Sequence, residues 1–80
     1  MSEWVVYILE CQDKSLYTGI TNDLERRITQ HEKGQGAKYT KGRGPFELKY
    51  TEQCNDKSHA LQRECEIKRL SHLQKLDLLN

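Results

Sequence analysis

Two tyrosines ten positions apart are the residues of this chain whose chemistry is most distinctive. Tyr7 and Tyr17 each lie in a short apolar, β-branched run, and the turn-forming residues 12–15 separate the two runs. This pattern predicts a β-hairpin with the two phenols side by side on one small sheet. Adjacent phenols are compatible with ordinary core packing, and they are also what a tyrosine-based phosphodiesterase needs. The tyrosines alone do not decide between these interpretations.

A carboxylate in the second half of the chain is the next candidate. The predicted helix over residues 58–70 has an apolar arc, and helical spacing places Glu64 near its middle and Glu66 on the polar side. The arc consists of Ala60, Leu61, Cys65 and Ile67. Because an unpaired buried carboxylate is costly, Glu64 needs a cation, a hydrogen-bond network or a metal ion. An ion pair with Lys68, four residues on, is the simpler alternative.

Positive charge gathers between Arg26 and Lys49. This stretch holds seven lysines and arginines against two acidic residues, and its residues 34–45 include four glycines and the only proline. Cationic and aromatic side chains on a loop whose backbone can approach a ligand suit phosphate contacts and stacking on bases. Solvated surface charge is the alternative. The candidate nucleic-acid contacts are Lys38, Tyr39, Lys41 and Arg43.

The helix that follows the hairpin has a start signal and a stop signal. Asn22 as N-cap and Glu25 three residues later form a capping box, and Gly34 is a stop, which predicts a helix over residues 23–33. The inner face of this helix carries Leu24, Ile28 and His31.

The phase of this helix separates two neighbouring arginines. Arg27 lies at the edge of the inner face, whereas Arg26 points the opposite way. Only Arg27 is therefore a candidate for a site beside the tyrosines. His31 also faces inward, although a lone histidine there is more often a hydrogen-bonded packing residue than a catalyst.

The remaining pattern completes a small α+β fold. Residues 46–51 alternate strictly between apolar and polar, which predicts a third strand with one buried face. Residues 58–70 follow as a second helix, and Ser71 can cap a short third helix. The predicted order is β-β-α-β-α-α, with a small three-stranded, mainly antiparallel sheet flanked by helices.

Length and composition limit the class of protein. Eighty residues predict a single domain spanning 1–80, and 13 lysines and arginines against 12 acidic residues provide no global attraction for nucleic acid. No apolar run approaches the roughly 18 residues of a membrane span, and the N-terminus lacks the layout of a signal peptide. The three cysteines have neither zinc-ligand spacing nor an even number, which argues against structural zinc and a disulfide framework. We therefore expect a cytoplasmic protein.

These features occur together in one known family. Val5-Val6-Tyr7 and Tyr17-Thr18-Gly19 resemble the two halves of the GIY-YIG nuclease motif. The resemblance continues through residues 22–28, where the family's essential arginine matches Arg27, and through residues 60–64, where its metal-binding glutamate matches Glu64. Residues 36–41 resemble a stretch typical of small stand-alone bacterial members, which are largely uncharacterised. Helical phase independently selects the same arginine and the same glutamate.

The resemblance implies a metal-dependent endonuclease-like domain that hydrolyses phosphodiester bonds in DNA, in repair or recombination, with RNA left open as a substrate. Glu64 would hold one Mg²⁺ or Mn²⁺ ion, and Arg27 would contact the scissile phosphate. Tyr7 would act as general base or relay, Tyr17 would orient the phosphate or water, and His31 would share in proton transfer. Because a free phenol has a pKa near 10, the base role requires cationic charge from Arg27 and the metal to favour phenolate.

Two other functions are compatible with the same residues. A nucleic-acid-binding module could keep the fold with little or no catalysis, since 80 residues leave little surface for selecting a target. A structural or protein-interaction domain would explain the fold but not the carboxylate of Glu64. The nuclease interpretation requires Tyr7, Tyr17, Arg27 and Glu64 to converge within one open cleft.

Overall fold

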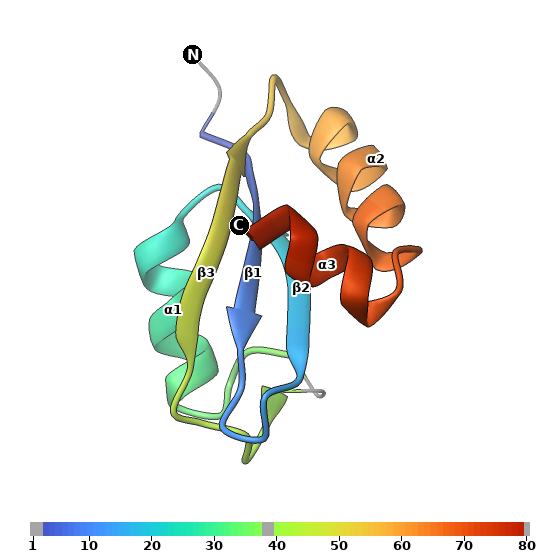
Figure 1. The fold of residues 1–80 in the computed structure, drawn as a ribbon. Coiled ribbons are helices and arrows are strands. Elements are labelled where there is room, and N and C mark those ends of the chain that lie inside the picture. Colours follow the sequence, from blue (N-terminus) through green and yellow to red (C-terminus); the bar gives the residue numbers. More distant parts are fainter. Residues whose placement is uncertain (1–2, 38–39, 80) are drawn as a thin grey trace.

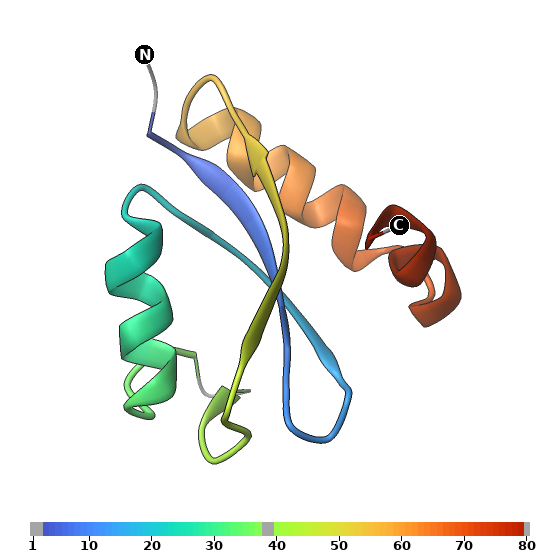
Figure 2. The ribbon, with the colours of Figure 1, turned by 60° about the vertical axis from the view of Figure 1, so that its left-hand side comes forward.

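The computed structural model describes residues 3–37 and 40–79, and this part of the chain contains three strands and three helices in the order β-β-α-β-α-α. The bounds are β1 Val5–Glu10, β2 Leu16–Thr21, α1 Leu24–Glu32, β3 Glu47–Gln53, α2 Lys57–Lys68 and α3 His72–Leu79. Helix α1 lies on one side of the sheet, and α2 lies on the other (Figures 1 and 2). The predicted α+β class and the element order are confirmed.

Strand β1 is the centre of an antiparallel sheet with the order β2-β1-β3. Because β1 is hydrogen-bonded on both edges and covered on both faces, four consecutive residues are buried, namely Val6, Tyr7, Ile8 and Leu9. Their side chains alternate between the two faces. Val6 and Ile8 form the main core with Cys54, Ala60 and Ile67, on the side of α2. Tyr7 therefore points to the opposite side, toward α1.

Strand β3 departs from the predicted single buried face. Its pairing with β1 is irregular between Ile8 and Leu9, because Ile8 pairs with Tyr50 and Leu9 pairs with Leu48. One residue of β3 is skipped, so Leu48 and Tyr50 no longer share a face. Tyr50 packs against the core, whereas Leu48 is exposed.

Helix α1 begins one residue later than predicted. Its N-cap is Asp23, whose carboxylate accepts a hydrogen bond from the backbone N–H of Arg26, so the predicted cap at Asn22 is wrong. The hydroxyl of Thr21 accepts the Asp23 N–H at 3.0 Å and thereby fixes the turn that leads into the cap. Gly34, with φ of +76°, follows the end of the helix as predicted.

Helix α2 has a narrower apolar face than predicted. It buries Ala60 and Ile67 against the sheet, but Leu61 and Cys65 are exposed, so the predicted arc through them is wrong. Positions three and four residues after Ala60 share the inward face with it. Glu64 therefore still turns inward, on a face that only two apolar residues define.

Helix α3 begins with a capping box. The Ser71 hydroxyl accepts the backbone N–H of Gln74, and the side-chain oxygen of Gln74 accepts the backbone N–H of Ser71. Leu78 and Leu79 pack against the core, whereas Leu73 is exposed. The described helices include none that is long and apolar enough to cross a membrane.

The hydroxyl of Thr18 provides a test of core packing on β2. It is the one buried side-chain polar atom of the described residues that lacks a hydrogen-bond partner. An unsatisfied buried hydroxyl costs about 1–3 kcal/mol, so Thr18→Val is expected to raise the free energy of unfolding by about 1 kcal/mol in urea denaturation. Thr21→Val is the matched control and should lower stability, because the Thr21 hydroxyl accepts the Asp23 N–H. A destabilised Thr18→Val variant would show that the hydroxyl has a partner.

Candidate active site

The side chain of Tyr7 crosses the edge strand β2 at a glycine. Tyr7 is fully buried and pairs in register with Gly19. A Cβ atom at Gly19 would lie 2.6 Å from the Tyr7 hydroxyl oxygen and 3.0 Å from Cε2 of Tyr17. Any side chain at this position would displace both phenols, so the glycine allows them to meet. Their ring centroids lie 6.3 Å apart, which confirms the predicted pair.

His31 of α1 contacts both tyrosines. Its Nε2 atom lies 2.8 Å from the Tyr7 hydroxyl oxygen, and its ring centroid lies 5.2 Å from that of Tyr17. The histidine is 1% exposed. Helix α1 turns it toward the sheet together with Leu24 and Ile28, which are half-buried, as the sequence predicts. The inward-facing histidine is thus in direct contact with a phenol that could do chemistry.

Burial sets the protonation states of this pair. Desolvation raises the pKa of Tyr7 to about 12, because it outweighs the hydrogen bond from Arg27 that favours phenolate. Desolvation, and after it the charge of Arg27, lowers the pKa of His31 to about 4. At neutral pH Tyr7 therefore keeps its proton and His31 is a neutral acceptor. Arg27 by itself does not make Tyr7 a phenolate, and the expectation that Arg27 and a metal ion together favour phenolate stays a prediction.

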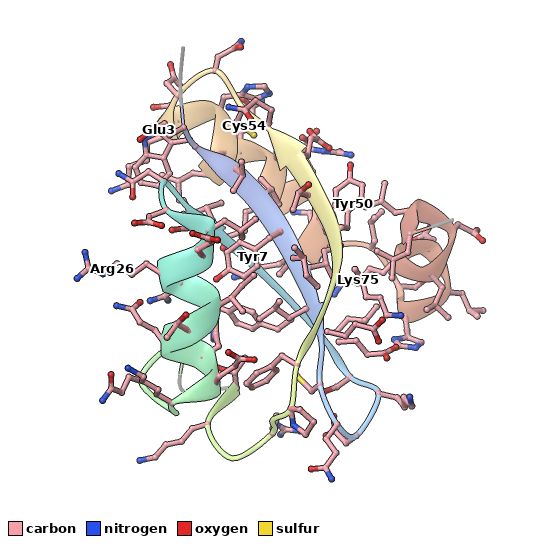
Figure 3. All side chains as sticks on the ribbon, turned by 90° about the vertical axis from the view of Figure 1, so that its left-hand side faces the viewer. Glu3, Tyr7, Arg26, Tyr50, Cys54 and Lys75 are labelled. Carbon is pink, nitrogen blue, oxygen red and sulfur yellow. The ribbon has the colours of Figure 1, made fainter. Side chains whose placement is uncertain are left out.

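Arg27 lies beside the phenols, as helical phase predicts. Its Nε atom donates to the Tyr7 hydroxyl at 3.4 Å, which is long for a hydrogen bond, and its Nη1 atom donates to Oε1 of Gln30 at 3.2 Å. The contact with Tyr7 is the main reason that the pKa of Arg27 is raised. Arg26 is exposed and points away from the sheet (Figure 3). Arg27 bonds to the Tyr7 hydroxyl, whereas Arg26 lines the same cavity as Arg27 at the N-terminal end of α1.

Two cavities lie next to the site residues, one beside Arg27 and one beside Tyr17. Arg27 lines a cavity at the N-terminal end of α1 together with Trp4. Tyr17 lines a different cavity, of about 360 Å³, together with Lys68 of α2 and Lys75 of α3. Arg27 and Tyr17, two of the four residues expected to converge in one open cleft, thus line different cavities.

Glu64 belongs to the α2 side of the sheet. Its carboxylate forms an ion pair with Lys68 at 3.4 Å, which is the simpler of the two predicted alternatives, and its side chain is 19% exposed. Burial is the main cause of the raised pKa of Tyr7, and the negative charge of Glu64 adds to it. Glu64 is therefore reachable by solvent and electrostatically coupled to Tyr7, but a lysine holds its carboxylate.

A divalent metal ion fits this arrangement with one ligand from the chain. Among the described residues, no three His, Cys, Asp or Glu side chains are grouped closely enough to hold a metal ion. Mg²⁺ usually keeps several waters and binds through one or two carboxylates plus substrate phosphates. The partly exposed carboxylate of Glu64 meets that requirement if Lys68 moves aside. Metal binding would then depend on a bound phosphate.

The basic loop, residues 34–45, is described only in part by the structure. Two of its four candidate nucleic-acid contacts, Lys38 and Tyr39, lie outside the described residues. Lys41 is exposed, whereas the guanidinium of Arg43 forms an ion pair with Asp13 in the hairpin turn. The role of these residues in nucleic-acid binding stays a prediction, and Arg43 also ties the loop to the hairpin.

Two residues that hold His31 in place were missed by sequence reasoning. The buried Thr40 places its hydroxyl oxygen 2.8 Å from Nδ1 of His31. A Cβ atom at Gly36 would lie 2.8 Å from Cε1 of the same ring, so the loop backbone packs directly on the imidazole. The high glycine content of the loop was the one available signal, since such close approach requires glycine.

Known proteins resemble this chain along nearly its whole length. The family model described as the GIY-YIG catalytic domain matches residues 3–77. The chain is 57% identical over 74 residues to the UPF0213 protein OB0043 from Oceanobacillus iheyensis, covering 92% of this chain and 86% of that protein. It is 51% identical over 80 residues to the UPF0213 protein SSP2268 from Staphylococcus saprophyticus, covering 100% of this chain and 98% of that protein.

Two solved structures share the fold. The solution NMR structure of the UPF0213 protein BH0048 from Bacillus halodurans has 51% sequence identity and a TM-score of 0.62, covering 95% of this chain and 81% of that one. The solution NMR structure of the protein EF2693 from E. faecalis has 38% identity and a TM-score of 0.62, covering 92% of this chain and 80% of that one.

Proposed function

The chain belongs to the GIY-YIG catalytic-domain family, and from this premise we propose that it is a metal-dependent endonuclease that hydrolyses phosphodiester bonds in DNA, in repair or recombination. The observation that carries the proposal is the contact of Tyr7 with both His31 and Arg27 at the edge of the sheet. Tyr7 can carry a proton, the neutral His31 can accept it, and Arg27 supplies a positive charge beside them. Phosphodiester hydrolysis needs all three.

Tyr7 would relay a proton and would not need to exist as phenolate. When a water molecule attacks phosphorus, its proton passes to the Tyr7 oxygen while the Tyr7 proton passes to Nε2 of His31, 2.8 Å away. The bond from phosphorus to the leaving oxygen breaks, and that oxygen takes a proton from solvent. The imidazolium then releases its proton to solvent. This route removes the difficulty of a phenol whose pKa is about 12.

Substrate must open the way to Tyr7, because that side chain is fully buried. Arg27 covers the hydroxyl through its long 3.4 Å contact. A phosphate offers the guanidinium two charge-assisted hydrogen bonds, which are stronger than one bond to a neutral phenol. Movement of Arg27 onto the scissile phosphate would therefore uncover the Tyr7 hydroxyl. The half-buried Tyr17 beside it would orient the phosphate or the water.

Glu64 would hold the Mg²⁺ or Mn²⁺ ion. Such an ion supplies positive charge beside the phosphoryl and leaving oxygens. Lys68 would leave the carboxylate of Glu64, and its ammonium group lies by the same cavity as Lys75 and Tyr17. Two lysines there suit the phosphates of a nucleic-acid strand, and the exposed Lys41 would add a contact from the loop.

A nucleic-acid-binding module with little or no catalysis is the second candidate. The burial of Tyr7 and the ion pair that occupies Glu64 both favour it, because neither group is exposed for chemistry without rearrangement. Such a module would bind DNA with an affinity that falls as salt rises, and would release it unchanged.

Cleavage by a Glu64→Gln variant tests the proposal. Labelled branched, nicked and single-stranded DNA would be incubated with the purified protein and Mg²⁺ or Mn²⁺. We expect the wild-type protein to cleave at least one of these, and Glu64→Gln to be slower by at least about 100-fold, because a neutral amide is a poor ligand for a hard cation. Glu66→Gln, which changes an exposed carboxylate of the same helix, is the matched control and should cleave at the wild-type rate.

The other outcomes separate the two candidates. Equal cleavage by wild type and Glu64→Gln would contradict the metal assignment. Salt-dependent binding of DNA without any turnover would favour the binding module. No binding at low salt would contradict both.

A further inference from the structure

Both nitrogen atoms of the His31 ring are engaged in buried hydrogen bonds. Nε2 lies 2.8 Å from the Tyr7 hydroxyl oxygen, and Nδ1 lies 2.8 Å from the hydroxyl oxygen of Thr40. Tyr7, His31 and Thr40 are each at most 1% exposed. Water is therefore not available to exchange with either contact, and the protons must be arranged so that each contact has one donor and one acceptor.

The hydroxyl of Thr40 decides that arrangement. Its oxygen lies 2.9 Å from the backbone carbonyl oxygen of Ala37, which can only accept a hydrogen bond. The single hydroxyl proton is used in that bond, so Thr40 presents a lone pair to the His31 ring. Nδ1 must then carry the hydrogen. A neutral imidazole has one N–H group, so Nε2 is bare and accepts the proton of Tyr7.

The Arg27 contact agrees with this assignment from the other side. A guanidinium can only donate, so the Tyr7 oxygen accepts from Nε of Arg27 while its own proton points to His31. In the opposite tautomer, Nε2 would donate to the Tyr7 oxygen. The buried Tyr7 proton would then lose its acceptor, and the carbonyl of Ala37 would keep only the backbone N–H of Thr40, 3.1 Å away. The low pKa of His31, about 4, keeps the ring in its neutral form at physiological pH.

We infer that Thr40 is a positioning residue that holds His31 in the Nδ1–H tautomer and thereby leaves Nε2 free to take the proton of Tyr7. Gly36 helps to fix the orientation of the His31 ring, because the backbone at that position lies against the imidazole. The catalytic consequence rests on the proposed nuclease function, whereas the tautomer itself does not. The basic loop therefore has a role besides any contact with nucleic acid: it sets the proton position on a residue of helix α1.

The imidazole ¹⁵N spectrum of the wild-type protein tests the assignment without any cleavage assay. At neutral pH we expect a protonated signal for Nδ1 of His31 and a bare signal for Nε2, each with its coupling to the ring protons. A protonated Nε2 with a bare Nδ1 would overturn the inference. His59 and His72, which lie elsewhere in the chain, serve as internal references and can be assigned by single replacements.

Two variants of Thr40 connect the tautomer to turnover. Thr40→Ser keeps the hydroxyl and should retain both the spectrum and kcat within about threefold. Thr40→Val removes the acceptor, so the Nδ1–H population should fall and kcat should fall by about 10–100-fold with little change in KM, as is typical when the partner that orients a functional histidine is lost. Folding of each variant would be checked by its backbone amide spectrum.

The outcomes distinguish this inference from the proposed function. The expected wild-type tautomer in a protein that cleaves no nucleic acid would support the positioning role and contradict the nuclease. Turnover of Thr40→Val equal to that of the wild type, in a folded protein, would contradict the positioning role and leave the nuclease standing.

Discussion

Replacing Arg27 with alanine is expected to lower kcat for DNA cleavage by about 10³-fold or more, the scale on which a single arginine acts in phosphoryl transfer. Arg27 is the cation that lies against the phenols, where its Nε atom donates to Tyr7. In the proposed reaction it leaves that contact and binds the scissile phosphate with two hydrogen bonds. Its loss removes the positive charge that would stabilise the negative charge on the phosphoryl oxygens.

Two companion variants sharpen this prediction. Arg27→Lys keeps the charge but not the planar fork, so it should recover only part of the lost rate. Arg26→Ala removes a neighbouring charge that lines the same cavity but points away from the sheet (Figure 3), and its kcat should stay within about threefold of wild type. Single-turnover rates at saturating DNA provide the measurement. Similar losses for the two alanine variants would indicate a general effect of positive charge on DNA binding and would contradict a specific role for Arg27.

Helical phase succeeded for the first helix because its apolar and polar positions are cleanly separated. Leu24, Ile28 and His31 turn inward together, and the same rotation brings Arg27 to the edge of the sheet and leaves Arg26 in solvent. The spacing of apolar and polar residues can be read from the sequence and compared with the 3.6-residue period of a helix. These placements therefore required no knowledge of tertiary structure.

For the second helix, the predicted inward orientation of Glu64 is correct, although the predicted apolar face is wrong. Leu61 and Cys65 belong to the predicted apolar face of α2, yet both are exposed. Ala60 and Ile67 are seven residues apart and define that stripe. Glu64 lies between them on the same side, so its inward orientation was predicted although the face was not.

The proton arrangement of the site lay beyond sequence reasoning. Contacts from Thr40 and Gly36 to His31 depend on how an irregular loop folds back on a helix, and irregular loops have no period to read. Burial of Tyr7 has the same origin, since it requires α1 to close over the ring that crosses Gly19. The sequence identified Arg27 as the nearby cation, but it did not show the desolvation that outweighs the effect of Arg27 on the pKa of Tyr7.

Removing only the hydroxyl of Tyr7 isolates the proposed relay. Tyr7→Phe keeps the ring over Gly19 and deletes the one atom that contacts both His31 and Arg27. Because a positioned acid–base group contributes about 10²–10⁴-fold, kcat is expected to fall within that range with little change in KM. Nε2 of His31 also loses its partner, so the free energy of unfolding should fall by about 1–3 kcal/mol in urea denaturation.

A second tyrosine separates the chemical effect from the structural one. Tyr50 donates its hydroxyl to Glu52 at 2.6 Å on the opposite face of the sheet, so Tyr50→Phe should lose stability but keep kcat within about threefold.

The wild-type rate should fall only as the pH drops toward 4, because His31 must be neutral to accept the proton and its pKa is about 4. Desolvation lowers the pKa of His31, and the positive charge of the neighbouring Arg27 lowers it further. A rate that falls near pH 6.5 would instead assign the proton acceptor to a hydrated histidine. In the Tyr7→Phe experiment, a folded protein with kcat within tenfold of wild type would exclude the relay.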